Sequence, residues 1–129
     1  MSSEELKMRE AEVLALRNQL DDTARKTRLS VEAFKDDTDK PRMDLIPADV
    51  VLELARVMAY GARKYSPDNW RKGMAWTRPI AAALRHINAW QRGESTDPES
   101  GLPHLAHAII SLMFVAAYEL RKIGEDDRW

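Results

Sequence analysis

The spacing of hydrophobic residues along the chain predicts helices and no strands. Apolar residues recur every three or four positions in residues 48–64 and again in residues 77–92, which is typical of a helix with one buried face. Residues 103–123 are apolar on nearly every side between Leu105 and Ala117, so we expect this helix at the centre of the fold. No segment alternates apolar and polar residues with a period of two. The predicted fold is therefore all-α, a small bundle of three main helices.

A further helix is predicted before the bundle, over residues 3–28. Leu6, Val13 and Leu20 recur every seven residues, but polar side chains interrupt the second seam that a regular coiled coil needs. Two interpretations stay open: a weak coiled coil that joins subunits, and a helix that packs on the body of the protein. We refer to this segment as the N-terminal arm.

A polar run, KDDTDK, ends just before Pro41 and predicts a boundary between the arm and the body. The predicted organisation is an arm at residues 1–34 and a domain at residues 35–129. Three body helices enclose only a small core, so we expect a homo-oligomer that shares helices. The polar tail after Gly124 is expected to fray, with Gly124 as the cap that ends the last helix.

Composition excludes several classes of protein. Lys and Arg number 20 against 21 Asp and Glu, a near-balance that argues against bulk binding to nucleic acid or to an anionic membrane. The absence of cysteine excludes disulfides, thiolate zinc sites and cysteine nucleophiles. No apolar run approaches the roughly 20 residues of a membrane span, and the acidic N-terminus does not resemble a signal peptide. We therefore expect a cytoplasmic protein, in a host cytoplasm if a phage encodes it.

One cluster of side chains is suited to a divalent metal ion. Glu94 and Asp97 lie on the loop at residues 93–103, and His104 and His107 follow three residues apart at the start of the last helix. Carboxylate and imidazole together suit Mn, Co, Zn or Fe. The competing interpretation is that His107 packs in the core with one hydrogen bond, while the acidic residues only complement the helix dipole.

A second cluster is basic and aromatic, and it suits a nucleotide. Arg and Lys bind phosphate oxygens, Tyr and Trp offer faces on which a base stacks, and Asn69 either reads a base edge or caps a turn. The alternative is an exposed basic loop that Trp70 anchors to the core. We include His86, although a core histidine beside Trp90 is the commoner explanation. The candidate substrate-binding residues are Lys40, Arg42, Lys64, Tyr65, Asn69, Trp70, Lys72 and His86.

Three segments resemble a known family: KPRMDLIP at residues 40–47, YGARKYSPDNW at residues 60–70, and RHINAWQRGESTDPESGLPHLAHA at residues 85–108. Together they are similar to the N-terminal domain family of phage dATP/dGTP diphosphohydrolases, with the all-α MazG-type enzymes as a neighbouring superfamily. The resemblance implies a phage protein that acts on deoxynucleotides. It also implies hydrolysis of a nucleoside triphosphate between the α and β phosphates, with Mg or Mn held by helix carboxylates.

The chain departs from the MazG pattern in its carboxylates. It has no Glu-x-x-Glu pair, and the first body helix offers only Glu53. Glu94 and Asp97 have Glu-x-x-Asp spacing, but Gly93 and Pro98 place them on a loop. There is also no serine-nucleophile elbow and no glycine-rich phosphate loop, so side chains and a metal ion must handle any phosphate.

Three functional hypotheses follow. In the first, the protein is a metal-dependent nucleoside triphosphate pyrophosphohydrolase, with Glu53 and Glu99 as catalytic carboxylates and Glu99 as the general base. Its metal would be Mg or Mn, with Co or Zn as alternatives. In the second, it binds a nucleotide without turnover, as a sensor, a sponge or an accessory to a hydrolase. In the third, it is an oligomeric interaction protein that works through the N-terminal arm.

Overall fold

The computed structural model describes residues 1–129, except for the side chains of residues 26–31. The chain divides into two units, residues 1–41 and residues 42–129, which are described separately below. Unit 1 contains one long helix, α1 (Ser3–Val31). The predicted end of this helix near residue 28 lies among the residues whose side chains are not described.

Helix α1 has no buried side chain among residues 3–25. Leu6, Val13 and Leu20, which repeat every seven residues, are 50%, 57% and 68% exposed. Since most of the stability of a helix in a protein comes from packing of its apolar face, this stripe is available to a partner. Whether that partner is a second arm or another surface stays open, as it was from the sequence.

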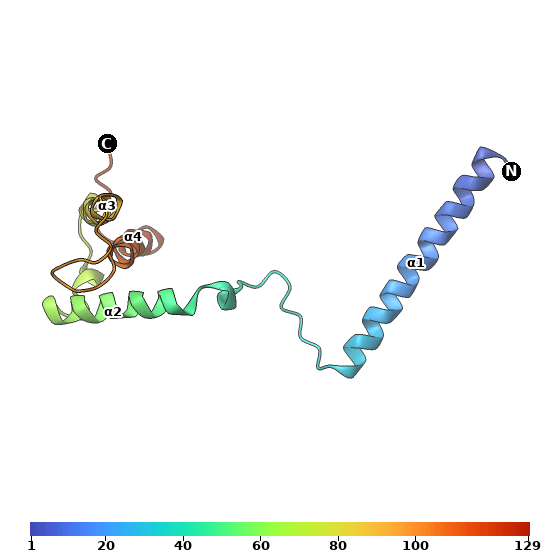
Figure 1. The fold of residues 1–129 in the computed structure, drawn as a ribbon, viewed down its shortest axis with the longest axis horizontal. Coiled ribbons are helices and arrows are strands. Elements are labelled where there is room, and N and C mark those ends of the chain that lie inside the picture. Colours follow the sequence, from blue (N-terminus) through green and yellow to red (C-terminus); the bar gives the residue numbers. More distant parts are fainter. The chain divides into compact units, whose positions relative to one another are not determined.

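Unit 2 contains three helices, α2 (Ala48–Lys64), α3 (Thr77–Gln91) and α4 (His104–Arg121), together with two short 3-10 turns, η1 (Met43–Leu45) and η2 (Asn69–Lys72). In the described part of the chain there is no strand, only two isolated β-bridges. The prediction of an all-α fold is therefore confirmed. Figure 1 shows α3 and α4 side by side, with α2 running across them.

Helix α4 forms the centre of unit 2, as its sequence predicts. It packs against both α2 and α3, which each bury a much smaller set of side chains. Val57 of α2 meets Ala106 and Ile110 of α4 in the core cluster. The buried residues of α4 are His104, Ala106, His107, Ala108, Ile110 and Tyr118. Two histidines are thus buried among apolar residues at the first turns of the central helix.

The prediction of a frayed C-terminal tail is wrong. The backbone N–H of Trp76 donates to the carbonyl of Glu125 at 2.9 Å, and the Asp127 carboxylate accepts hydrogen bonds from the backbone N–H (3.0 Å) and the hydroxyl of Thr77. These hydrogen bonds lower the pKa of Asp127. A carboxylate at a helix N-terminus satisfies free N–H groups there, so the tail fixes the start of α3.

The predicted cap at Gly124 is also wrong in detail. Lys122 adopts the left-handed conformation that ends α4, with φ of 56°. Gly124 has φ of 78° and lies directly against the backbone of Met74. The glycine is therefore needed for close approach between the tail and the loop before α3, rather than for the helix cap.

Part of the apolar surface of unit 2 remains exposed. Along α4, Leu105, Ile109, Leu112 and Met113 are each 39–45% exposed. An exposed apolar stripe of this kind is expected on a helix that packs against a second subunit. The homo-oligomer stays a prediction. Among the residues that the structure describes, no helix combines the length and the hydropathy needed to cross a membrane.

We predict that Gly124→Ala destabilises the protein more than Gly93→Ala does. Both glycines have positive φ, 78° and 100°, and this backbone geometry costs an L-residue about 1–2 kcal/mol. An added Cβ at Gly124 would also clash with the Met74 carbonyl oxygen, whereas at Gly93 it meets nothing within 4 Å. Urea denaturation followed by circular dichroism measures both losses. Equal losses of unfolding free energy in the two variants would contradict the close packing of Gly124 against Met74.

Candidate functional site

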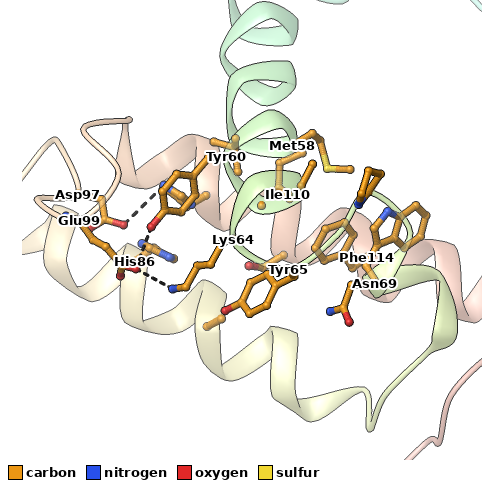
Figure 2. Close-up of a pocket in the computed structure, with 18 of the residues that line it drawn as sticks. Met58, Tyr60, Lys64, Tyr65, Asn69, His86, Asp97, Glu99, Ile110 and Phe114 are labelled. Atoms are coloured by element: carbon orange, nitrogen blue, oxygen red, sulfur yellow. Dashed lines mark hydrogen bonds and ion pairs between the residues drawn. The ribbon is translucent and has the colours of Figure 1, made fainter.

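A pocket of about 500 Å³ opens where the end of α2, the middle of α3 and the start of α4 face two loops. It brings together members of both clusters that the sequence indicates (Figure 2). The predicted site residues that line it are Lys64, Tyr65, Asn69, Trp70, His86, Asp97, Glu99, His104 and His107. Members of the predicted metal cluster and of the predicted nucleotide cluster therefore line one pocket.

The loop before α4 is folded so that the Asp97 side chain faces the helix. The Asp97 N–H donates to the Leu102 carbonyl, and the Gly101 N–H donates to the Asp97 carbonyl, both at 2.8 Å. Gly101 permits this tight closure because its φ is 73°. Pro103 is the N-cap residue, directly before the first residue of α4. As a result the Asp97 side chain is only 15% exposed and faces His107.

Three side chains converge in a way that could hold a metal ion: His86, Asp97 and His107. One ligand atom from each lies within 4.8 Å of the other two. The His107 Nε2 is 3.6 Å from the Asp97 Oδ2, and the rings of His86 and His107 stack with centroids 4.7 Å apart. Burial lowers the pKa of both histidines, so both rings are neutral near pH 7, which is the form that binds metals.

The type of donor decides which ions fit this group. Two imidazole nitrogens and one carboxylate oxygen suit Zn, Co, Mn or Fe, whereas Mg²⁺ prefers oxygen ligands throughout. The partly buried donors and the neutral rings thus fit a transition-metal ion. Asp97 and His107 were predicted as ligands, while His86 was predicted to bind substrate.

The other two predicted ligands, Glu94 and His104, do not belong to this group in the structure. The His104 Nε2 lies 2.6 Å from the Glu94 Oε1, and its Nδ1 lies 2.9 Å from the Nδ1 of His86. Both ring nitrogens of His104 are therefore already engaged with protein groups. Its side chain lines the pocket but is only 6% exposed.

Glu99 lies at the pocket rim and binds two side chains of α2. Its Oε1 accepts hydrogen bonds from the Lys64 Nζ at 2.6 Å and from the Tyr60 hydroxyl at 2.8 Å (Figure 2). The hydrogen bond from Lys64 lowers the pKa of Glu99, and the same contact raises the pKa of Lys64. A carboxylate held ionised in this way is a weak base, so the geometry favours a positioning role for Glu99 over the predicted general base.

Tyr60 is a site residue that the sequence reasoning missed. It lies one helical turn before Lys64, so both side chains occupy the same side of α2 and reach the same carboxylate. That four-residue spacing was the available signal. Arg85 was missed as well: it lines the pocket beside His86 and forms no ion pair with any described residue.

The opposite end of the pocket is aromatic. The Trp70 ring stacks on Phe114 of α4, with centroids 5.0 Å apart and planes 13° apart, and the Tyr118 hydroxyl donates to the Trp70 carbonyl at 2.6 Å. Trp70 is thus anchored in the fold, as the alternative interpretation of the basic loop proposed. The Tyr65 side chain is more open, at 65% exposed, and offers a free aromatic face. Asn69 is half-buried, and its side chain makes no hydrogen bond to any described residue.

The remaining predicted site residues lie outside the pocket. Arg42 pairs with Asp44 at 2.9 Å, and Glu53 pairs with Arg56 on the exposed part of α2. Lys72 ends η2 without lining the pocket, and Lys40 belongs to unit 1. The structure therefore gives the predicted catalytic residue Glu53 no contact with the other site residues.

Comparison with known proteins matches residues 30–128 to the family described as dATP/dGTP diphosphohydrolase, N-terminal. The chain is also 36% identical, over 97 residues, to a dATP/dGTP diphosphohydrolase of Salmonella phage PMBT28. The chain belongs to this family. The matched region is 74% of this chain but only 33% of the phage protein, so the chain spans about a third of that relative. No solved structure matches the chain significantly.

We predict that the pocket binds Co²⁺ with an affinity that depends on Asp97. In Asp97→Asn a neutral amide replaces the charged oxygen ligand, and the affinity is expected to fall about tenfold or more. Titration followed by visible absorption of the bound ion measures the change. Asp49→Asn is the matched control, since Asp49 is an exposed residue of α2 outside the pocket. Equal affinity in wild type and Asp97→Asn would contradict the assignment of the ligands.

Proposed function

We propose that unit 2 binds a purine deoxynucleoside triphosphate in this pocket and hydrolyses it, with a divalent metal ion, to the monophosphate and pyrophosphate. The observation that carries the proposal is the convergence of a His86, Asp97 and His107 donor group with Lys64 and Arg85 in one pocket. Membership of the family supports the substrate class, because the phage relative is named for dATP and dGTP. Net hydrolysis consumes one water and breaks the bridge between the α and β phosphates.

The metal ligands in this proposal are His86, Asp97 and His107. A divalent ion held by these residues would supply Lewis-acid polarisation of phosphoryl oxygens and activation of a water near neutral pH. The nitrogen-rich donor set favours Mn²⁺, Co²⁺ or Zn²⁺ over Mg²⁺. The protein itself keeps both imidazoles neutral by burial and holds Asp97 in place through the closed loop.

The cationic side chains of the pocket would bind the triphosphate. The Lys64 ammonium lies 5.5 Å from the centre of the Tyr65 ring, so charge and an aromatic face adjoin each other. Lys64 and Arg85 are placed to neutralise phosphate oxygens, and Glu99 with Tyr60 holds Lys64 in position. Tyr65 would then stack on the base, and the unpaired amide of Asn69 would meet its edge.

A second candidate function is nucleotide binding without turnover. One observation favours it: Glu99, the predicted general base, is tied to Lys64 and Tyr60. The short span of the match to the phage relative leaves room for a catalytic group elsewhere in that longer protein. A sensor or accessory role needs the basic and aromatic residues but not the metal ligands.

We predict that the purified full chain converts dATP or dGTP to monophosphate and pyrophosphate in the presence of Mn²⁺ or Co²⁺. Ion-exchange chromatography of the products, with each common dNTP and NTP, identifies the preferred base. Asp97→Asn is expected to lower kcat/KM about 100-fold or more, while Asp49→Asn leaves it unchanged. Nucleotide binding with no product from any nucleotide would instead support the binding module.

We predict that Lys64→Gln weakens binding of a non-hydrolysable deoxynucleoside triphosphate about tenfold, because a cation that contacts phosphate is lost. Lys72→Gln is the matched control: it removes the same charge from a lysine outside the pocket and is expected to leave the affinity almost unchanged. Isothermal titration calorimetry measures both. Equal weakening by the two variants would show that general charge, rather than the pocket, attracts the ligand.

A further inference from the structure

We propose that Glu94 and His104 act as positioning residues that fix the tautomer of His86, so that its Nε2 lone pair is free for the metal ion. The proposal rests on the proposed function, since it assigns a task to two side chains behind the donor group. It starts from one observation: the ring of His104 lies between a carboxylate and a second imidazole. The Glu94 Oε1 is 2.6 Å from its Nε2, and the His86 Nδ1 is 2.9 Å from its Nδ1.

The first step concerns His104. An ionised carboxylate only accepts hydrogen bonds, so in its neutral form the His104 ring carries its single proton on Nε2 and donates it to Glu94. Its Nδ1 then holds a lone pair and can only accept. Because the residue is 5% exposed, water does not compete for either nitrogen.

The second step concerns His86. Two ring nitrogens 2.9 Å apart need one proton between them, and His104 has none to give at Nδ1. The proton must therefore belong to the Nδ1 of His86, which donates to His104. A neutral ring with its proton on Nδ1 has its lone pair on Nε2. The chain of contacts from Glu94 thus determines which nitrogen of His86 can bind a metal.

The third step separates this role from direct ligation by His104. The donor group near Asp97 and His107 includes His86 but not His104. Both nitrogens of His104 are committed, whereas His86 has one nitrogen committed and one free. Partners behind a metal-binding histidine orient its ring and set its tautomer, and their loss commonly reduces metal affinity about 10–100-fold.

The test measures the tautomer and the metal affinity separately in the full chain. Long-range ¹H–¹⁵N NMR of the histidine rings, without metal, is expected to show His86 protonated on Nδ1 and His104 protonated on Nε2. His104→Leu removes the acceptor and should shift His86 toward the Nε2-protonated form. Its Co²⁺ affinity, followed by visible absorption, is expected to fall about 10–100-fold.

Two further variants keep the test decisive if His104→Leu does not fold. His104→Asn can place an amide oxygen near the position of Nδ1 and should restore the wild-type tautomer of His86 and most of the affinity. Glu94→Gln changes a side chain that is 53% exposed, so this variant should fold. Because a Gln amide can donate or accept a hydrogen bond, both tautomers of His104 should then be populated. Circular dichroism confirms folding in each case.

The outcomes distinguish the two proposals. Protonation of His86 on Nε2 in the wild type, or an unchanged His86 tautomer in the folded Glu94→Gln and His104→Leu variants, would overturn the positioning role. A changed tautomer with unchanged Co²⁺ affinity would overturn it as well. The stated tautomers together with no metal binding by the wild type would support the fixed tautomer and overturn metal-dependent hydrolysis.

Discussion

The burial of two imidazole rings at the start of α4 is the constraint on which the rest of the site depends. His104 and His107 are 5% and 9% exposed, and buried polar groups need hydrogen-bond partners to offset the loss of water. The loop before α4 supplies them: Glu94 reaches His104, while Asp97 and the Ser100 hydroxyl reach His107. No buried side-chain polar atom among the described residues lacks a partner. The loop conformation is therefore tied to the hydrogen bonds that the buried imidazoles of α4 require.

The same constraint generates the chemistry of the pocket. Because the loop contacts the two buried histidines, its residues Asp97 and Glu99 line the pocket near the start of α4. Lys64 of α2 and His86 of α3 line the same pocket (Figure 2). Burial keeps the imidazoles neutral, while the more exposed Glu99 stays ionised beside Lys64. One region thus combines neutral nitrogen donors with a fixed cation, the combination on which the proposed function rests.

The helices of unit 2 could be predicted from the sequence because their apolar residues follow a local period. The central place of α4 followed from its apolar composition, and Asp97 and His107 could be chosen because they lie ten residues apart around a loop. The approach of His86 to Asp97 and His107 could not be predicted, because it depends on packing of α3 against α4, which no local spacing encodes. Glu53 was chosen by analogy with carboxylate-rich helices, but it lies nearer the start of α2 than the segment that faces the pocket. The docking of Asp127 on Thr77 joins residues 50 positions apart and has no sequence signal.

The anchoring of the Trp70 loop has a kinetic consequence for ligand recognition. The Tyr118 hydroxyl holds the Trp70 carbonyl, and Phe114 covers the indole face, so this wall of the pocket exists before any ligand arrives. A preformed wall requires little loss of conformational freedom on binding. Under the proposed function, competing nucleotides would enter at similar rates and differ mainly in how long they stay bound. Selectivity among them would then depend on the dissociation rate rather than on the association rate.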